Sequence, residues 1–224
     1  MPRIRLLAAT LALSLVLPLA YAADGKDVDK VNGSITASAG QTWGDLETVN
    51  GSIHIEDGVS TGDAETVNGS IKVGDDARTG NLETVNGSVR LGNRVQAGRL
   101  ETVNGQIFAD HGSRLRGDIE TVNGAIGLVE TDLSGGITTV NGDITVGVGS
   151  HVGGGIRVEK PNRNWSIRFG KQRPPRIIIG PKAVVDGPLV FERDVVLYVH
   201  ETARTGAITG AKPIAYSQDH APVD

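Results

Sequence analysis

Residues Thr66 to Glu83 read T-V-N-G-S-I-K-V-G-D-D-A-R-T-G-N-L-E, and this stretch contains the whole repeating unit of the chain. Its most regular part, Val-Asn-Gly, starts at Val31, Val49, Val67, Val85, Val103, Val122 and Val140, with successive spacings of 18, 18, 18, 18, 19 and 18 residues. Apolar residues alternate at Ile71 and Val73 and return at Ala77 and Leu82, and Gly, Asn and Asp mark three turns between them. The pattern predicts three short strands and three corners per unit.

Such a unit is one rung of a three-sided parallel β-helix, also called a β-solenoid. A single rung cannot bury its apolar side chains alone, so the rungs must stack and pair with one another. The alternative is a series of unrelated Asn-Gly hairpins, which would join antiparallel strands and does not account for a constant period. We therefore expect an all-β, single-stranded parallel β-solenoid of about ten rungs of roughly 18 residues, with a length of roughly 48 Å at the spacing of paired strands.

The composition agrees with this prediction. The 224 residues include 31 Gly and 9 Pro but only 3 Phe, 3 Tyr and 2 Trp, which argues against a helical bundle. No cysteine is present, so the chain contains no disulfide, no thiolate metal site and no cysteine nucleophile.

The chain divides into four segments by sequence. Residues 1–22 combine two arginines, an apolar run and Ala20-Tyr21-Ala22, which is typical of a cleaved secretory signal peptide. Residues 23–156 carry the regular repeat, residues 157–211 an irregular continuation of the same solenoid with basic loops, and residues 212–224 a polar tail. In the continuation we expect strands at Asn164–Gly170, Ile177–Ile179 and Leu197–Val199. We predict a periplasmic, secreted or cell-surface location, with no membrane span after signal cleavage.

Stacking places identical residues in columns along the rod. One such column is predicted to be a corner ladder of side-chain amides, with the glycine after each asparagine tolerating a positive φ angle. The asparagines of this ladder are Asn32, Asn50, Asn68, Asn86, Asn104, Asn123 and Asn141.

The direction of the valine in Val-Asn-Gly is ambiguous. Strict alternation from Leu82 would point Thr84 inward and expose a column of seven valines. We expect instead that the chain bends at Glu-Thr, which returns the valine to the core and leaves the threonine hydroxyl at the corner.

A second column is acidic. It consists of Glu47, Glu65, Glu83, Glu101 and Glu120, one in each rung. Enzymes built on β-helices cluster carboxylates at a fixed separation, whereas these glutamates form a line, so we interpret them as a solvated acidic column. The more specific alternative is that divalent cations bind along the column. The sequence predicts no catalytic residue, no cofactor and no metal site.

Charge is distributed unevenly along the chain. Residues 23–155 contain 9 Lys and Arg against 19 Asp and Glu, whereas residues 156–224 contain 11 against 7. The basic residues gather in one region with an aromatic residue among them, and we predict partner binding there. The region consists of Arg157, Lys160, Arg163, Trp165, Arg168, Lys171, Arg173 and Arg176.

Two resemblances follow from these motifs. The repeated E-T-V-N-G-S-I resembles a bacterial β-solenoid family of adhesin-like proteins, found as the head domain of some autotransporter-like proteins. The stretch from Ile177 to Ile208, with I-I-I-G-P-K-A-V-V-D-G-P-L, is similar to the bactofilins, three-sided β-helices that polymerise end to end. The signal peptide departs from the bactofilins, which are typically cytosolic.

The first resemblance implies a non-enzymatic, exported envelope or surface protein whose repetitive faces contact macromolecules or other copies of the chain. The second implies a self-assembling filament subunit, and a carbohydrate-active β-helix enzyme is a minor alternative. Nucleic acid is not an expected partner, because the chain carries an export signal and a sequence pI near 5.7. Charged residues from Asp24 to Lys30 and Pro213 after the last expected rung favour protected ends over polymerisation.

Overall fold

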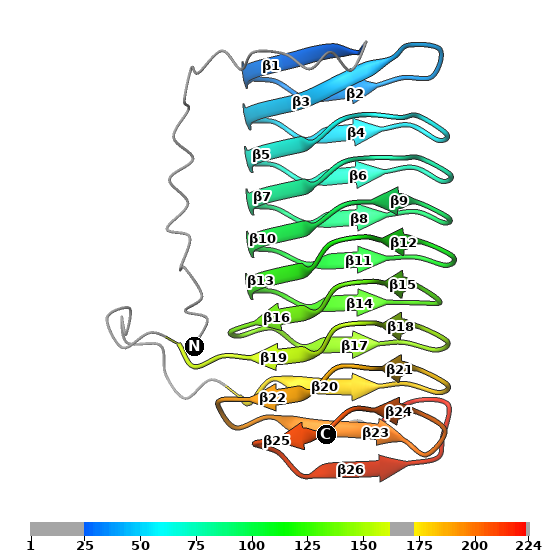
Figure 1. Ribbon diagram of the computed structural model, residues 1–224. Helices are drawn as coiled ribbons and strands as arrows, with labels where there is room; N and C mark the ends of the chain where they lie inside the picture. The colour runs from blue at the N-terminus through cyan, green and yellow to red at the C-terminus, as the bar shows by residue number, and fades with distance from the viewer. Residues whose placement is uncertain (1–24, 162–172, 223–224) are drawn as a thin grey trace.

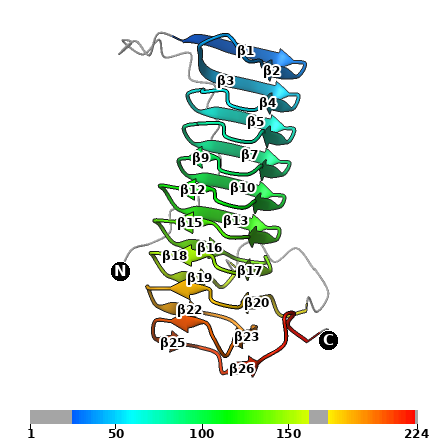
Figure 2. The same cartoon turned by 90° about the vertical axis from the view of Figure 1, so that its right-hand side faces the viewer.

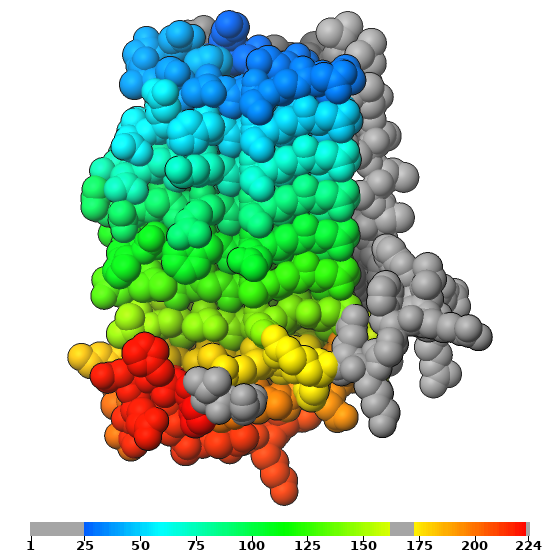
Figure 3. Space-filling view, turned by 180° about the vertical axis from the view of Figure 1, so that it is seen from behind, coloured from blue at the N-terminus to red at the C-terminus, as the bar shows by residue number. Residues whose placement is uncertain are grey.

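The computed structural model describes residues 25–161 and 173–222, which form a parallel β-solenoid (Figures 1 and 2). Three sheets run along the rod, and each strand pairs in parallel with the equivalent strand of the next rung. This architecture, with ten strands in each of two sheets, is the one predicted from the 18-residue period. In the space-filling view the rungs lie as successive bands from one end to the other (Figure 3).

Sheet A contains the strands that end in Val-Asn in the regular rungs. Its members in spatial order are β1 (Lys26–Asn32), β3 (Trp43–Asn50), β5 (Ala64–Asn68), β7 (Leu82–Asn86), β10 (Leu100–Asn104), β13 (Ile119–Asn123), β16 (Ile137–Thr139), β19 (Ile156–Val158), β22 (Leu189–Phe191) and β25 (Ile208–Thr209).

Sheet B follows the Asn-Gly corner. Its members are β2 (Ile35–Ala37), β4 (Ile53–Ile55), β6 (Ile71–Val73), β8 (Val89–Leu91), β11 (Ile107–Ala109), β14 (Ile126–Leu128), β17 (Ile144–Val146), β20 (Arg176–Ile179), β23 (Val196–His200) and β26 (Pro213–Tyr216).

Sheet C closes the triangle with shorter strands. They are β9 (Gln96–Ala97), β12 (Arg114–Leu115), β15 (Asp132–Leu133), β18 (His151–Val152), β21 (Val184–Val185) and β24 (Arg204–Thr205). In the earlier rungs this face is held by single bridges from Ser60 to Arg78 and from Arg78 to Gln96.

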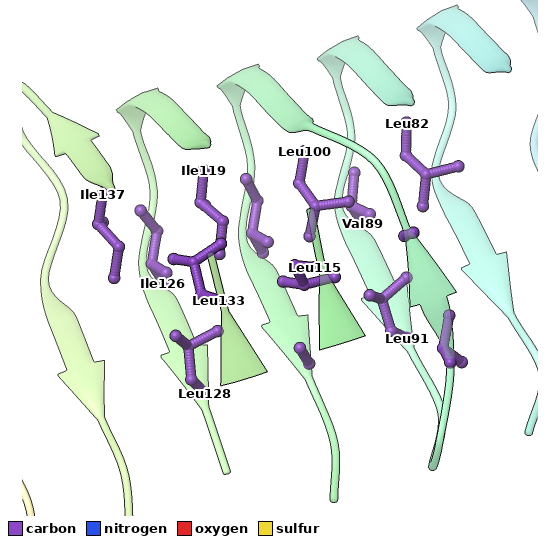
Figure 4. Packing of buried hydrophobic residues seen from close by; sticks show 14 of the residues in the cluster. Leu82, Val89, Leu91, Leu100, Leu115, Ile119, Ile126, Leu128, Leu133 and Ile137 are labelled. Atoms are coloured by element: carbon purple, nitrogen blue, oxygen red, sulfur yellow. The ribbon is translucent and has the colours of Figure 1, made fainter. Parts of the chain in front are cut away.

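The core is a set of apolar columns inside the triangle. Figure 4 shows Leu82, Leu100 and Ile119 of sheet A stacked in one column, with Leu115 and Leu133 of sheet C entering from another face. All five side chains are at most 1% exposed. Burial of one apolar residue from each strand on every rung supplies the hydrophobic stabilisation that an isolated rung lacks.

The corner after each asparagine requires glycine for a reason different from the predicted one. Gly33 has a positive φ angle of 110°, whereas Gly51 and Gly69 do not. A Cβ on Gly51 would lie 2.5 Å from the carbonyl carbon of Gly33, and one on Gly69 would meet the Gly51 carbonyl in the same way. Glycine is needed because consecutive corners stack in backbone contact, and left-handed φ angles occur instead in the turn after sheet B, for example at Gly58, where φ is 70°.

The expected bend at Glu-Thr is wrong. Thr48 and Thr84 are each 4% exposed, whereas the valine that follows in each rung faces outward and is half-buried, and Val31 in the first rung is 63% exposed. The threonine hydroxyl is satisfied inside the rod, because Thr84 Oγ1 donates a hydrogen bond to the Gly69 carbonyl at 2.9 Å. Strict alternation therefore holds and leaves an outward column of valines.

The irregular part continues the solenoid, and its strand pairing differs from the prediction in one rung. Ile177–Ile179 and Leu197–Val199 lie in sheet B as predicted, and β19 crosses the expected boundary at residue 156. The Asn164–Gly170 segment lies outside the described residues, and β17 pairs directly with β20, so the prediction of a rung between them is wrong.

The last rung comes from the segment expected to be a polar tail. β26 pairs with β23 through Leu197–Pro213 and His200–Tyr216, and Tyr216 is 8% exposed. A proline can occupy this strand because β26 is the edge of sheet B. The signal peptide predicted at residues 1–22 lies outside the described residues.

The stacking register gives a direct test. Removing residues 65–82 deletes one rung and joins Ala64 to Glu83, and because Ala64 and Leu82 are register partners, every column is preserved. We expect this variant to fold with an unchanged far-ultraviolet circular dichroism shape, a slightly lower melting temperature and a rod shorter by about 4.8 Å in small-angle scattering.

Removing only residues 65–73 is the control, because it shifts the columns by half a rung. This second variant should lose cooperative unfolding. If the two variants unfold alike, pairing of equivalent residues between rungs is not what stabilises the structure.

Candidate functional site

The five glutamates of the repeat form one outward column on sheet A. The register pairs run from Glu47 through Glu65, Glu83 and Glu101 to Glu120. Asp29 extends the column at the N-terminal end. At the other end the same position is taken by Thr138, Arg157, Val190 and Thr209, so the acidic column stops after Glu120.

One arginine interrupts the negative charge. Arg99 Nη2 lies 2.7 Å from Glu83 Oε1 and 3.3 Å from Glu101 Oε2, so it bridges two rungs. Sequence reasoning did not single out Arg99, although its position two residues before Glu101 corresponds to Asp45 and Asp63 in earlier rungs.

Burial and mutual repulsion alter the acidity of this column. Burial raises the pKa of Glu65, and the neighbouring carboxylates of Glu83 and Glu47 raise it further. Burial likewise raises the pKa of Glu47, with Asp29 adding to the effect. The pKa of Glu101 is raised by burial and held back by Arg99. Protonation of these three side chains is therefore easier than protonation of a free glutamate.

The seven corner asparagines form a continuous ladder of side-chain amides. Each Nδ2 donates a hydrogen bond to the Oδ1 of the asparagine one rung earlier, with donor–acceptor distances between 2.9 and 3.1 Å. The ladder ends at Arg193, whose Nη1 donates to Asn141 Oδ1 and, at 3.0 Å, to the Val140 carbonyl. Arg193 stands outside the repeat, so the sequence gives no sign of this contact.

Carboxylates form further ladders that the sequence analysis missed. Asp45 Oδ1 accepts a hydrogen bond from the backbone N–H of Asp63, and Asp63 Oδ1 accepts one from Asn81. At another corner, Asp57 Oδ1 accepts from the Asp75 N–H at 2.8 Å. The signal for both ladders is Asp or Asn at the 18-residue period. These side chains replace a strand partner where the backbone turns.

The outward column of sheet B was also missed. His54, Lys72, Arg90 and Phe108 are register partners on four successive rungs. His54, Lys72 and Arg90 line a shallow surface groove of about 380 Å³ that extends over the turns after β4, β6 and β8, together with the carboxylates of Asp57, Asp75 and Asp110. Each of the four register partners is the middle residue of a three-residue strand whose first and third residues are apolar. The 18-residue period identifies this outward position, although the residue type there changes from rung to rung.

The predicted basic region is only partly described. Arg163, Trp165, Arg168 and Lys171 lie outside the described residues, and Lys160 is exposed.

The described arginines of this region are paired. Arg157 Nη1 binds Glu192 Oε1 at 2.9 Å, and Arg173 Nη1 donates to Asp143 Oδ1 at 3.2 Å. The Arg176 guanidinium lies 5.0 Å from the centre of the Tyr198 ring, and its Nη2 donates to a backbone carbonyl near the C-terminus. Intramolecular contacts thus neutralise part of the positive charge that we predicted to bind a partner molecule.

An imidazole bridges two carboxylates on the outer face of sheet C. His151 Nδ1 lies 3.0 Å from Asp132 Oδ1, and Nε2 lies 2.7 Å from Asp186 Oδ2. Hydrogen bonding to Asp186, and then to Asp132, raises the pKa of His151. The bridge ties together three rungs.

The described residues contain neither a membrane-spanning helix nor a cluster of metal ligands. Within residues 25–161 and 173–222, no helix is long and apolar enough to cross a membrane. In that same part of the chain, no group of three or more His, Asp or Glu side chains is arranged to hold a metal ion.

Comparison with protein-family models, with curated proteins and with solved structures gives no match. We therefore infer function from the columns and the groove themselves.

The acidic column predicts a pH-dependent stability. Glu65→Gln removes the central charge of three in register, and we expect it to raise the free energy of unfolding at pH 7 by about 0.5 kcal/mol. Because the folded-state pKa of Glu65 lies above the ordinary value of 4.5, the repulsion is present above the folded-state pKa and is relieved as the pH falls through it. Denaturant titrations should show the advantage of Glu65→Gln shrinking between pH 7 and pH 4.

Glu201→Gln is the matched control, because it removes one exposed negative charge from a turn outside the column. It should change stability little at either pH. An advantage of Glu65→Gln that is the same at pH 7 and pH 4 would contradict charge repulsion as its cause.

The amide ladder gives a second prediction. Asn68 makes two ladder hydrogen bonds, and Asn32 at the end of the ladder makes one. We expect Asn68→Ala to lower the free energy of unfolding by about 1–2 kcal/mol and Asn32→Ala by about half as much, as measured by urea denaturation. If both replacements have equally small effects, the ladder does not stabilise the rod.

Proposed function

We propose that the protein is a non-enzymatic, exported rod of the bacterial envelope or cell surface that presents repetitive faces to macromolecular partners. The observation that supports this most directly is the in-register stacking of outward side chains, such as the glutamates joined by the Glu65–Glu83 pair. A flat face with one side chain of a kind per rung offers many equivalent contacts to an extended partner, and many weak contacts along one partner add to a strong attachment.

The signal peptide expected at residues 1–22 supports export, and the resemblance to adhesin-like β-solenoids supports a role at the cell surface. Export and a role at the cell surface are both parts of the proposal. The competing candidate is a filament subunit, which the unpaired outer edges of β1 and β26 favour.

The ends of the rod support single particles over filaments. At the N-terminal end, Trp43 Nε1 donates a hydrogen bond to the Ser38 carbonyl at 3.0 Å, and the Lys26 ammonium lies 5.8 Å from the centre of the Trp43 ring. The C-terminal end is filled by Tyr216, which packs edge-on against His200 with 5.0 Å between ring centres. Packed aromatic side chains of the protein itself thus lie near both ends.

Electron microscopy and sedimentation test the proposal together. The full chain should appear in negative stain as single rods of constant length at all concentrations, and it should sediment with isolated bacterial cell envelopes in a saturable manner. Its rung-deleted form lacking residues 65–82 should bind more weakly because it offers fewer equivalent contacts. Filaments that lengthen with protein concentration would favour the competing candidate, and absence of sedimentation with envelopes would overturn the proposal.

A further inference from the structure

Seven Asn-Gly dipeptides form the corner between sheets A and B, and asparagine before glycine is especially prone to lose its side-chain amide. Glycine has no side chain to hinder its own backbone nitrogen, so that nitrogen can reach Cγ of the preceding asparagine and close a five-membered cyclic imide. This deamidation needs a side chain that can turn toward the glycine nitrogen and space around the corner for the ring. Stacking of the rungs controls both.

The amide ladder fixes the side chains of the interior asparagines. Asn68 is an example, because its Nδ2 donates to Asn50 Oδ1 at 3.0 Å and its Oδ1 accepts from Asn86 Nδ2 at 3.1 Å. Rotation of the Asn68 side chain toward Gly69 would break both hydrogen bonds. The same pair of hydrogen bonds holds every ladder asparagine from Asn50 to Asn123.

The glycine of an interior corner is held from both sides. The Gly51 N–H donates to the Asn68 carbonyl of the next rung at 3.1 Å, and a Cβ on Gly51 would lie 2.5 Å from the carbonyl carbon of Gly33 in the rung before. A cyclic imide at Asn50 would have to form between two layers of backbone. The corner must therefore open before an interior asparagine can react.

The first corner is different, because no described rung precedes it. Figure 1 shows β1 and β2, which this corner joins, at one end of the rod. Within the described part of the chain, Asn32 uses only Oδ1, which accepts from Asn50 Nδ2 at 3.1 Å, and its own Nδ2 has no partner.

Space is also available at the first corner. Apart from the neighbours of Gly33 in the chain, the nearest atom to a Cβ on this glycine would be Lys30 Cδ, 4.0 Å away. The Gly33 N–H donates to the Asn50 carbonyl at 2.9 Å, as in the interior corners. What distinguishes Asn32 is therefore its free amide and the open space beside it.

The other end of the ladder is closed by side chains. Arg193 Nη1 donates to Asn141 Oδ1, and Asn141 Nδ2 donates to Asn123 Oδ1 at 2.9 Å. The Gly142 N–H donates to Thr139 Oγ1 at 3.0 Å, and a Cβ on Gly142 would lie 2.7 Å from the same oxygen. Asn141 thus has both amide atoms occupied, although no further amide follows it in the ladder.

We propose that Asn32 is a site of spontaneous deamidation and that stacking protects the other six asparagines of the ladder. The backbone nitrogen of Gly33 bonds to Asn32 Cγ, and the Cγ–Nδ2 bond breaks. Nδ2 leaves as ammonia and takes up the proton that the Gly33 nitrogen loses. Water then opens the cyclic imide at either carbonyl, which gives aspartate or isoaspartate. This inference goes beyond the proposed function and does not depend on it.

The aspartate product is compatible with the ladder only at its free end. Aspartate at position 32 still accepts a hydrogen bond from Asn50 Nδ2, because a carboxylate is an acceptor. Aspartate at position 68 would have no N–H to donate to Asn50 Oδ1. Isoaspartate lengthens the backbone, and at position 32 it disturbs an edge strand that is paired on one side only. Stacking thus directs the reaction to the rung where its products disturb the fewest contacts.

Peptide mapping of the folded full chain, incubated at mildly alkaline pH, tests the proposal. Samples are digested at acidic pH, where deamidation is slow, with a protease that cleaves after glutamate. Each fragment then contains one Asn-Gly dipeptide, and mass spectrometry gives the fraction of each asparagine converted to aspartate or isoaspartate. The glutamates that separate the seven asparagines are Glu47, Glu65, Glu83, Glu101, Glu120 and Glu130.

We expect Asn32 of the folded chain to be converted at least tenfold faster than any other asparagine of the ladder, because the others react only when their corners open. In a parallel sample unfolded in urea, all seven asparagines should be converted at similar rates, since each follows valine and precedes glycine.

Asn86→Ala tests whether the ladder itself protects. It removes the acceptor of Asn104 Nδ2, so Asn104 should be converted several-fold faster than in the unmodified protein. Asn123 keeps its acceptor and should keep its rate. Asn93→Ala is the matched control, because it removes an asparagine of the same rung whose side chain binds Asp75 outside the ladder. It should leave the rate at Asn104 unchanged.

Conversion of Asn32 in the folded chain at the rate of the interior asparagines would overturn the proposal. Equal increases at Asn104 and Asn123 in the Asn86→Ala variant would also overturn it, because protection would then come from the stability of the whole rod and not from the ladder.

Discussion

The closest approach between rungs, at the Asn-Gly corner, is the constraint on which the structure depends. There the backbone of Gly51 lies against that of Gly33 with no room for a Cβ, and the neighbouring Asn50 donates its amide to Asn32. The hydroxyl of Thr48 donates to the Gly33 carbonyl from inside the rod at 3.1 Å. Three residue types are thus fixed at each corner by one geometry, and a shift of register by a single residue would place all three wrongly.

Stacking in register also has a cost, because it brings identical charges together. Five glutamates lie in one column, and burial and repulsion raise the pKa of Glu65, which lies between Glu47 and Glu83. Arg99 relieves part of this repulsion by entering a position that holds aspartate in earlier rungs. Where the repeat fades beyond residue 156, the column carries Arg157, which is paired with Glu192. Electrostatics thus helps to explain why an otherwise uniform repeat changes along the rod.

The fold was predictable because its determinants recur. A period of 18 residues with Val-Asn-Gly specifies the strands, the corners and the amide ladder without knowledge of any distant contact. Strict alternation already pointed Thr48 inward, but we expected a bend because the sequence does not show the carbonyl of the preceding rung that accepts its hydroxyl. β26 and the cap of the ladder by Arg193 were missed for a related reason, since neither segment carries the repeated motif. A contact that occurs only once leaves no repeated sequence pattern from which it could be predicted.

The same distinction guides where function should be sought on a repetitive rod. A residue that is identical in every rung, such as the corner asparagine, is explained by the stacking that it stabilises, so its recurrence alone says little about a partner. The middle position of the sheet B strands has no such explanation, because it faces outward and changes from His54 to Lys72, Arg90 and Phe108. Stacking imposes none of these four residue types. The outward column of sheet C varies in the same way, from Arg78 to Gln96, Arg114 and Asp132, so on both faces the residues that stacking leaves free, and not the repeated corner, are where a partner should be sought.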